Sequence, residues 1–119
     1  MKISILGTSY QIKYKNEQED EYLKQKNGYC DFTTKEIVCI KFNDEDKNIV
    51  GAYGNFNEIE KEVLRHEIIH AFIYESGLWS NTYGANHWAT NEEMTDWFAI
   101  QSPKIFAVYK KLNILDKGE

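Results

Sequence analysis

Residues 57–77 read NEIEKEVLRHEIIHAFIYESG, and they decide the fold because they carry the clearest hydrophobic period in the chain. Apolar residues recur three or four positions apart, at Ile59, Val63, Leu64, Ile68, Ile69, Phe72 and Ile73. This spacing gathers them on one side of an α-helix. Asn57 followed by Glu60 is typical of a helix N-terminus, and Gly77 is typical of a helix end. We therefore expect an amphipathic helix over this stretch.

Upstream of this stretch the period becomes that of strands. Residues 2–6 and 10–14 are rich in β-branched and aromatic side chains, and Tyr10, Ile12 and Tyr14 alternate onto one face. Residues 29–32 and 36–42 flank a short polar turn, which indicates a hairpin whose second arm shares one face among Val38, Ile40 and Phe42.

Downstream, Asn91 is placed to cap a second helix running to about residue 101, with Glu92 and Glu93 in its first turn. A third amphipathic helix is expected over residues 103–112, beginning at Pro103. The predicted fold class is thus α+β: a small N-terminal antiparallel or mixed β-sheet followed by three helices, in a single domain over residues 1–119.

Composition narrows the range of partners. The chain has 119 residues, of which 42% are hydrophobic, and a formal net charge of −5, so it offers no basic surface for nucleic acid. We also expect no membrane partner, because no apolar run approaches the roughly 20 residues of a bilayer span. Without an apparent export signal, Cys30 and Cys39 are expected to be reduced packing residues in a cytoplasmic protein.

The chemistry is suggested by His66, Glu67 and His70. Two histidines four residues apart lie above one another on a helix, so both imidazoles can reach one metal ion. Zinc accepts neutral imidazole nitrogens and keeps one position open for water in catalytic sites. A carboxylate beside them, at Glu67, can accept a proton from that water. The pattern therefore predicts a Zn²⁺ site with Glu67 as general base.

A third ligand is available at the start of the second helix. Glu92 and Asp96 form another pair four residues apart, so Glu92 can bind the metal while Asp96 accepts the outer N–H of a ligand histidine. Glu93 is the alternative ligand, but it lies about 100° further round the helix and lacks the partnership with Asp96.

The pattern His-Glu-x-x-His at residues 66–70, followed by Asn-Glu-x-x-x-Asp at residues 91–96, resembles that of the gluzincin metallopeptidases. The segment ending Asp96-Trp97-Phe98-Ala99 is also similar to the small ImmA/IrrE-type metallopeptidases of phages and mobile elements. The resemblance implies a minimal zincin-like fold of phage or prophage origin. It implies His66, His70 and Glu92 as zinc ligands, with Asp96 supporting a ligand histidine.

The loop before the second helix contributes further candidates. His87 could stabilise the oxyanion that develops on a scissile carbonyl, could replace Glu92 as a ligand, or could be an ordinary packed residue. Tyr83 is a weaker candidate for the oxyanion role. We assign the three tryptophans of this half of the chain to the core: Trp79, Trp88 and Trp97.

Two functions follow from these residues. The first is a zinc-dependent metallopeptidase whose peptide or protein substrate adds to the edge of the strand at residues 36–42. The alternative is a zinc-stabilised, non-catalytic binding or regulatory protein, in which a fourth protein ligand, with His87 the leading candidate, closes the metal site. The sequence does not reveal the oligomeric state.

Overall fold

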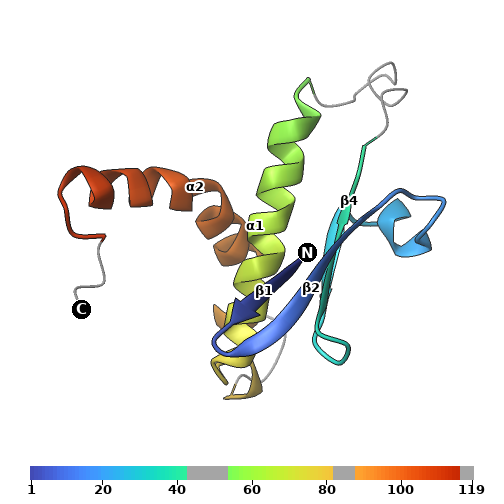
Figure 1. Ribbon diagram of the computed structural model, residues 1–119, viewed down its shortest axis with the longest axis horizontal. Coiled ribbons are helices and arrows are strands. Elements are labelled where there is room, and N and C mark those ends of the chain that lie inside the picture. The colour runs from blue at the N-terminus through green and yellow to red at the C-terminus, as the bar shows by residue number, and fades with distance from the viewer. Residues whose placement is uncertain (43–53, 82–87, 116–119) are drawn as a thin grey trace.

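The computed structural model describes residues 1–42, 54–81 and 88–115. Within these ranges, four strands are followed by two α-helices, and short 3-10 turns lie among the strands and between the helices (Figure 1). The strands are β1 (Lys2–Ile5), β2 (Thr8–Lys15), β3 (Gly28–Asp31) and β4 (Glu36–Ile40). The helices are α1 (Phe56–Glu75) and α2 (Glu92–Lys111), and the 3-10 turns are η1 (Glu21–Lys24), η3 (Trp79–Asn81) and η4 (Trp88–Thr90). The α+β arrangement with an N-terminal sheet is confirmed.

The four strands form one mixed sheet in the order β1-β2-β4-β3. β1 is antiparallel to β2, β2 is parallel to β4, and β4 is antiparallel to β3. The predicted hairpin at residues 29–42 is therefore present. The expectation that its second arm offers a free edge is wrong, because β4 is hydrogen-bonded on both sides. Among the described strands, the sheet ends at β1 and β3.

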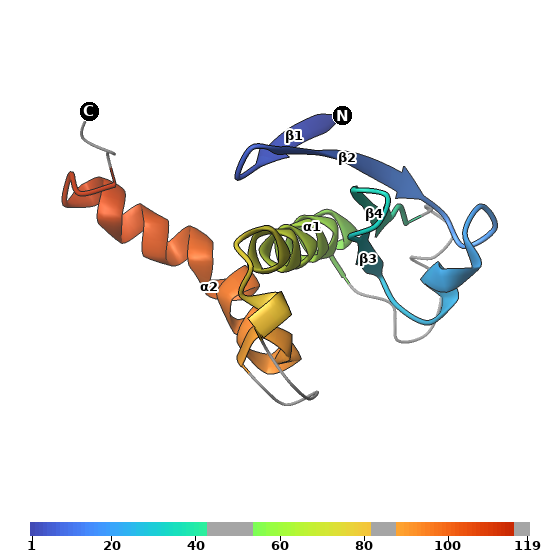
Figure 2. The same cartoon turned by 90° about the horizontal axis from the view of Figure 1, so that it is seen from below.

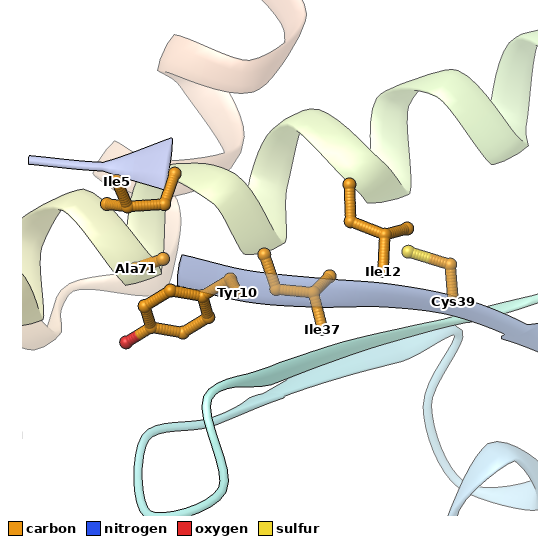
Figure 3. Packing of buried hydrophobic residues seen from close by; sticks show 6 residues of the cluster. All are labelled: Ile5, Tyr10, Ile12, Ile37, Cys39 and Ala71. Carbon is orange, nitrogen blue, oxygen red and sulfur yellow. The ribbon is translucent and has the colours of Figure 1, made fainter. Parts of the chain in front are cut away.

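The main core lies between the sheet and α1. Figure 3 shows buried side chains from β1, β2 and β4 meeting Ala71 of α1. They are Ile5, Tyr10, Ile12, Ile37 and Cys39. Val63, Leu64 and Ile68 of α1 pack against this cluster, as the helical period requires. On the opposite face of the sheet Val38 and Ile40 pack with Leu23 of η1.

The cap of α1 lies two residues before the predicted cap at Asn57, so that prediction is wrong. The cap is Asn55, whose side chain accepts a hydrogen bond from the Glu58 backbone N–H at 3.2 Å. The earlier start lets Phe56 become part of the helix, where it is buried and stacks on Phe42 with ring centroids 4.5 Å apart. The end is as expected: Gly77 has a φ of +84°, the left-handed conformation that glycine adopts without strain.

The prediction of three helices is also wrong, because the second and third are one continuous helix. Asn91 caps it as expected, accepting from the Met94 N–H at 2.9 Å. Pro103 lies inside α2, where its missing N–H leaves the carbonyl of Ala99 without the usual helical donor. Arg65 of α1 donates its Nε–H to that carbonyl at 2.6 Å, which compensates for the loss and allows the helix to continue.

The two helices are placed differently with respect to the sheet. In Figure 2, α1 is seen almost end-on with the sheet curling round one side, while α2 passes the other side and projects outward. The core assignment of the tryptophans is wrong, since Trp79, Trp88 and Trp97 are between 41% and 61% exposed. Neither described helix has a stretch long and apolar enough to cross a membrane.

Candidate metal centre

Two helices bring the predicted site residues together. His66, Glu67 and His70 lie in the middle of α1, which is held against the sheet by its apolar side. Glu92 is the first residue of α2 and Asp96 lies one turn later. The Asn91 cap fixes where α2 begins and so places Glu92 in its first turn.

Three potential ligands converge at the crossing of α1 and α2. The Nε2 atoms of His66 and His70 are 3.0 Å apart. A carboxylate oxygen of Glu92 lies 3.2 Å from the His66 Nε2, and the two oxygens lie 3.4 and 3.0 Å from the His70 Nε2. Ligands at 2.0–2.1 Å in a tetrahedral zinc site are separated by about 3.3–3.4 Å. The spacing of these atoms is therefore close to that required for one shared zinc ion.

The second nitrogen of His66 strengthens this interpretation. Its Nδ1 lies 2.7 Å from Oδ1 of Asp96, the position expected for the carboxylate that orients a ligand histidine. When Nδ1–H is donated to Asp96, Nε2 is left as a lone-pair acceptor facing the Glu92 carboxylate, which is also an acceptor. A divalent cation between these atoms would satisfy both. The donor set, two imidazoles and a carboxylate, thus fits zinc.

Glu67 differs from the ligands in its environment. Its side chain is buried, and this burial raises the pKa of the carboxyl to about 7, despite the opposing effect of His66. Its carboxylate lies within 4.8 Å of the ring nitrogens of His66 and His70. We assign the ligand role to Glu92 rather than Glu67, because Glu92 makes the shorter approaches of 3.0–3.4 Å to both rings. Glu67 can instead exchange a proton near neutral pH at the edge of the site.

Burial affects His70 in the opposite direction. It lowers the pKa of the imidazole, against the attraction of Glu92, and so favours the neutral form that binds metals. On the α2 side, the Glu92 and Asp96 side chains are 64% and 63% exposed.

A cleft of about 730 Å³ adjoins these residues and is bounded by strand β3. Its lining includes Gly28, Tyr29 and Cys30 on the strand side and Glu67 on the helix side. A cleft of this size can hold a small ligand or a short length of peptide. The thiol of Cys30 is not activated there, because burial and the nearby Glu67 raise its pKa to about 12. Cys30 and Cys39 are both free, as expected.

Sequence reasoning missed the part that Gly28 has in this cleft. A Cβ on Gly28 would lie 2.7 Å from Cγ1 of Val63, 3.0 Å from the Val38 carbonyl and 3.4 Å from Cγ of Glu67. Glycine therefore permits α1 to approach β3 closely enough for Glu67 to border the cleft. A glycine just before a predicted strand is typical of an ordinary turn, so the sequence does not indicate the close approach of α1 at Gly28.

Two of the predicted residues cannot be placed. His87 and Tyr83, the candidates for oxyanion stabilisation, fall within residues 82–87, which lie outside the described part of the chain. Their roles stay predictions. Glu93, the alternative ligand, is exposed in the first turn of α2, while the short approaches to His66 and His70 are made by Glu92.

Comparison of the chain with models of protein families, with curated proteins and with solved structures found no match.

Proposed function

We propose that this protein is a minimal zinc-dependent metallopeptidase of the gluzincin type. The observation that carries the proposal is the convergence of His66, His70 and Glu92, with ligand atoms 3.0–3.4 Å apart, beside a buried carboxyl group and an open cleft. A site with only a structural role is usually closed by a fourth protein ligand. Among the described residues three ligands converge beside a cleft, and this arrangement favours a catalytic site over a structural one.

Each residue of the site has a definite task in this proposal. A zinc ion held by His66, His70 and Glu92 would polarise a peptide carbonyl and acidify a water molecule. Glu67 takes a proton from the attacking water and later delivers it to the leaving amine. Asp96 holds His66 in the tautomer whose Nε2 faces the metal. A cation nearby would lower the pKa of Glu67 and so favour the carboxylate form that acts as base.

The edge of β3 supports an extended peptide as substrate. The Ile40 N–H donates to the Asn27 carbonyl at 2.8 Å, and hydrogen-bonded pairs alternate along an antiparallel ladder. The backbone N–H and C=O groups of Gly28 and Cys30 therefore point away from β4, at the side of the strand that borders the cleft. A peptide strand can add to such an edge through main-chain hydrogen bonds.

The direct test of this mechanism is Glu67→Gln, assayed on a library of quenched fluorescent peptides. We expect zinc to be retained and the rate of hydrolysis to fall by about 10²–10⁴-fold, the usual contribution of a general base. Glu58→Gln, at an exposed position in the first turn of the same helix, is the matched control and should keep full activity. Unchanged hydrolysis in Glu67→Gln would refute the mechanism.

A chelator separates this function from a zinc-stabilised, non-catalytic protein. The core between α1 and the sheet is formed by apolar side chains that do not depend on the metal. We therefore expect chelation to abolish hydrolysis while circular dichroism still reports a folded protein. Zinc-loaded protein should also bind a hydroxamate, which needs an open coordination position. Loss of the fold on chelation, without hydroxamate binding, would support the non-catalytic alternative instead.

A further inference from the structure

Pro103 removes one backbone hydrogen bond of α2 where this helix crosses α1. In an uninterrupted α2 the backbone N–H at position 103 would donate to the carbonyl of Ala99, but proline has no such N–H. Ala99 is fully buried, so water could not easily compensate for the missing donor.

Arg65 supplies the donor from the other helix. Its Nε lies 2.6 Å from the Ala99 carbonyl oxygen, in a partly buried contact between residues 34 positions apart in sequence. A hydrogen bond from a charged donor is stronger than one between neutral groups. Pro103 thus leaves the Ala99 carbonyl of α2 without its helical donor, and Arg65 of α1 donates a hydrogen bond to it.

The position of this contact links it to the metal ligands. Arg65 directly precedes His66, whose Nδ1 contacts Asp96 at 2.7 Å, and Ala99 lies three residues beyond Asp96 on α2. Consecutive residues of α1 therefore hold α2 at two points about one turn apart. Two such points restrict both sliding along the axis of α2 and rotation about it, and these motions would move Glu92.

The apolar packing in this region does little to fix the position of α2 along α1. The buried residues of α2 are small: Thr95, Ala99 and Ser102. Small side chains allow the helices to approach closely but provide few large knobs to resist sliding. The hydrogen bond from Arg65 to the Ala99 carbonyl therefore adds a restraint against sliding that the small side chains do not provide.

We propose that Arg65 is a positioning residue: through its hydrogen bond to the Ala99 carbonyl, it sets where α2 presents Glu92 to His66 and His70. The inference rests on the proposed zinc site and adds to it how the ligand from the second helix is held in place. Arg65 is not one of the proposed ligands and is not among the residues that line the cleft. It acts through the backbone of α2.

The experiment combines Arg65→Met, Pro103→Ala and the double variant. Zinc affinity is measured by competition with a chromophoric chelator, and stability by urea unfolding of the metal-free protein. We expect Arg65→Met to weaken zinc binding by about 10–100-fold, the usual effect of losing a group that supports a ligand. Pro103→Ala alone should keep zinc affinity, because Arg65 is still present to hold α2.

The double variant distinguishes two explanations for the effect of Arg65. Either Arg65 positions α2, or it only supplies a hydrogen-bond donor to the buried Ala99 carbonyl. An alanine at position 103 supplies the missing N–H within α2, so unfolding stability should recover relative to Arg65→Met. Zinc affinity should stay low, because the bond between the helices is still absent. Recovery of both quantities would overturn the proposal, since it would show that only the unpaired carbonyl mattered. The double variant also keeps the test decisive if Arg65→Met alone fails to fold.

Electrostatics provides a further control. Removing a positive charge from α1 would, by itself, strengthen binding of a cation. Lys61→Met, one turn before Arg65 and exposed, should therefore leave zinc affinity unchanged or slightly raised. Equal zinc affinity in the wild type and Arg65→Met would overturn the inference alone, whereas a wild type that binds no zinc would overturn the proposed function itself.

Discussion

At the scale of single residues, Gly28 has the most specific structural requirement. The Cβ of an alanine at this position would lie 2.7 Å from Val63 Cγ1 and 3.0 Å from the Val38 carbonyl oxygen, so α1 and β3 would have to separate. We expect Gly28→Ala to lower the free energy of unfolding by about 1–3 kcal/mol, the usual cost of overpacking, as measured by urea unfolding.

Gly54→Ala is the matched control for this prediction, because a Cβ there meets no atom of the described residues within 4 Å. It should leave stability within about 0.5 kcal/mol of the wild type. Equal stability of the Gly28→Ala and wild-type proteins would show that α1 does not approach β3 as closely as described.

Helical spacing alone predicts that His66 and His70 lie together, whereas the approach of Glu92 to them depends on how α2 crosses α1. His66 and His70 share a face of α1, and the spacing between Glu92 and Asp96 is enough to favour Glu92 over Glu93. The close approach at Gly28 could not be predicted. It depends on contacts between residues distant in sequence, which no local pattern reports.

At the scale of elements, the end of α1 is tied to the sheet through Glu75. Its carboxylate accepts hydrogen bonds from Thr8 Oγ1 at 3.0 Å, Tyr10 OH at 2.6 Å and Lys35 Nζ at 2.8 Å. The bond from Lys35 is the largest cause of a lowered pKa at Glu75, followed by the bond from Tyr10. The charged form of Glu75 therefore stabilises the contact between helix and sheet.

This contact makes stability depend on pH. A lowered folded-state pKa gives stability that is fully present above the ordinary value of 4.5 and is lost as the pH falls through the folded-state value. We expect the melting temperature of the wild type to exceed that of Glu75→Gln at pH 6–7, and the difference to shrink below about pH 4.5. Glu17→Gln, at an exposed position, is the control. A difference that is constant with pH would contradict this role for Glu75.

The errors of prediction also belong to this scale. The helical period predicts α1 correctly, but it places the cap at Asn57 rather than Asn55, because the stacking of Phe56 on Phe42 is a tertiary contact. Pro103 wrongly predicts the start of a third helix, because proline normally ends the preceding one. The donor that lets α2 continue comes from Arg65 on the other helix, so the local sequence could not reveal it.

At the scale of the whole molecule, α2 has two unlike halves. Its first half crosses α1 and carries Glu92, the proposed ligand, whereas its second half projects away from the sheet and α1 (Figure 1). The same substitution should therefore have very different effects at the two ends. Ala99 is fully buried in the first half, and Ala107 is exposed in the second.

We expect Ala99→Leu to cost about 1–3 kcal/mol in unfolding free energy, because leucine would be forced into the seam between the helices. It should also weaken zinc binding, since displacing α2 displaces Glu92. Ala107→Leu should stay within about 0.5 kcal/mol of the wild type. Equal effects of the two changes in urea unfolding would mean that α2 does not pack on α1 through Ala99.

The central claim is that two imidazoles of α1 and one carboxylate of α2 hold a single zinc ion. Its most direct test is metal analysis by mass spectrometry of protein purified without added metal, comparing the wild type with Glu92→Ala and Glu93→Ala. We expect one zinc per chain in the wild type and in Glu93→Ala, and a large loss of zinc in Glu92→Ala. A wild type without zinc, or a Glu92→Ala variant that retains it fully, would contradict the claim.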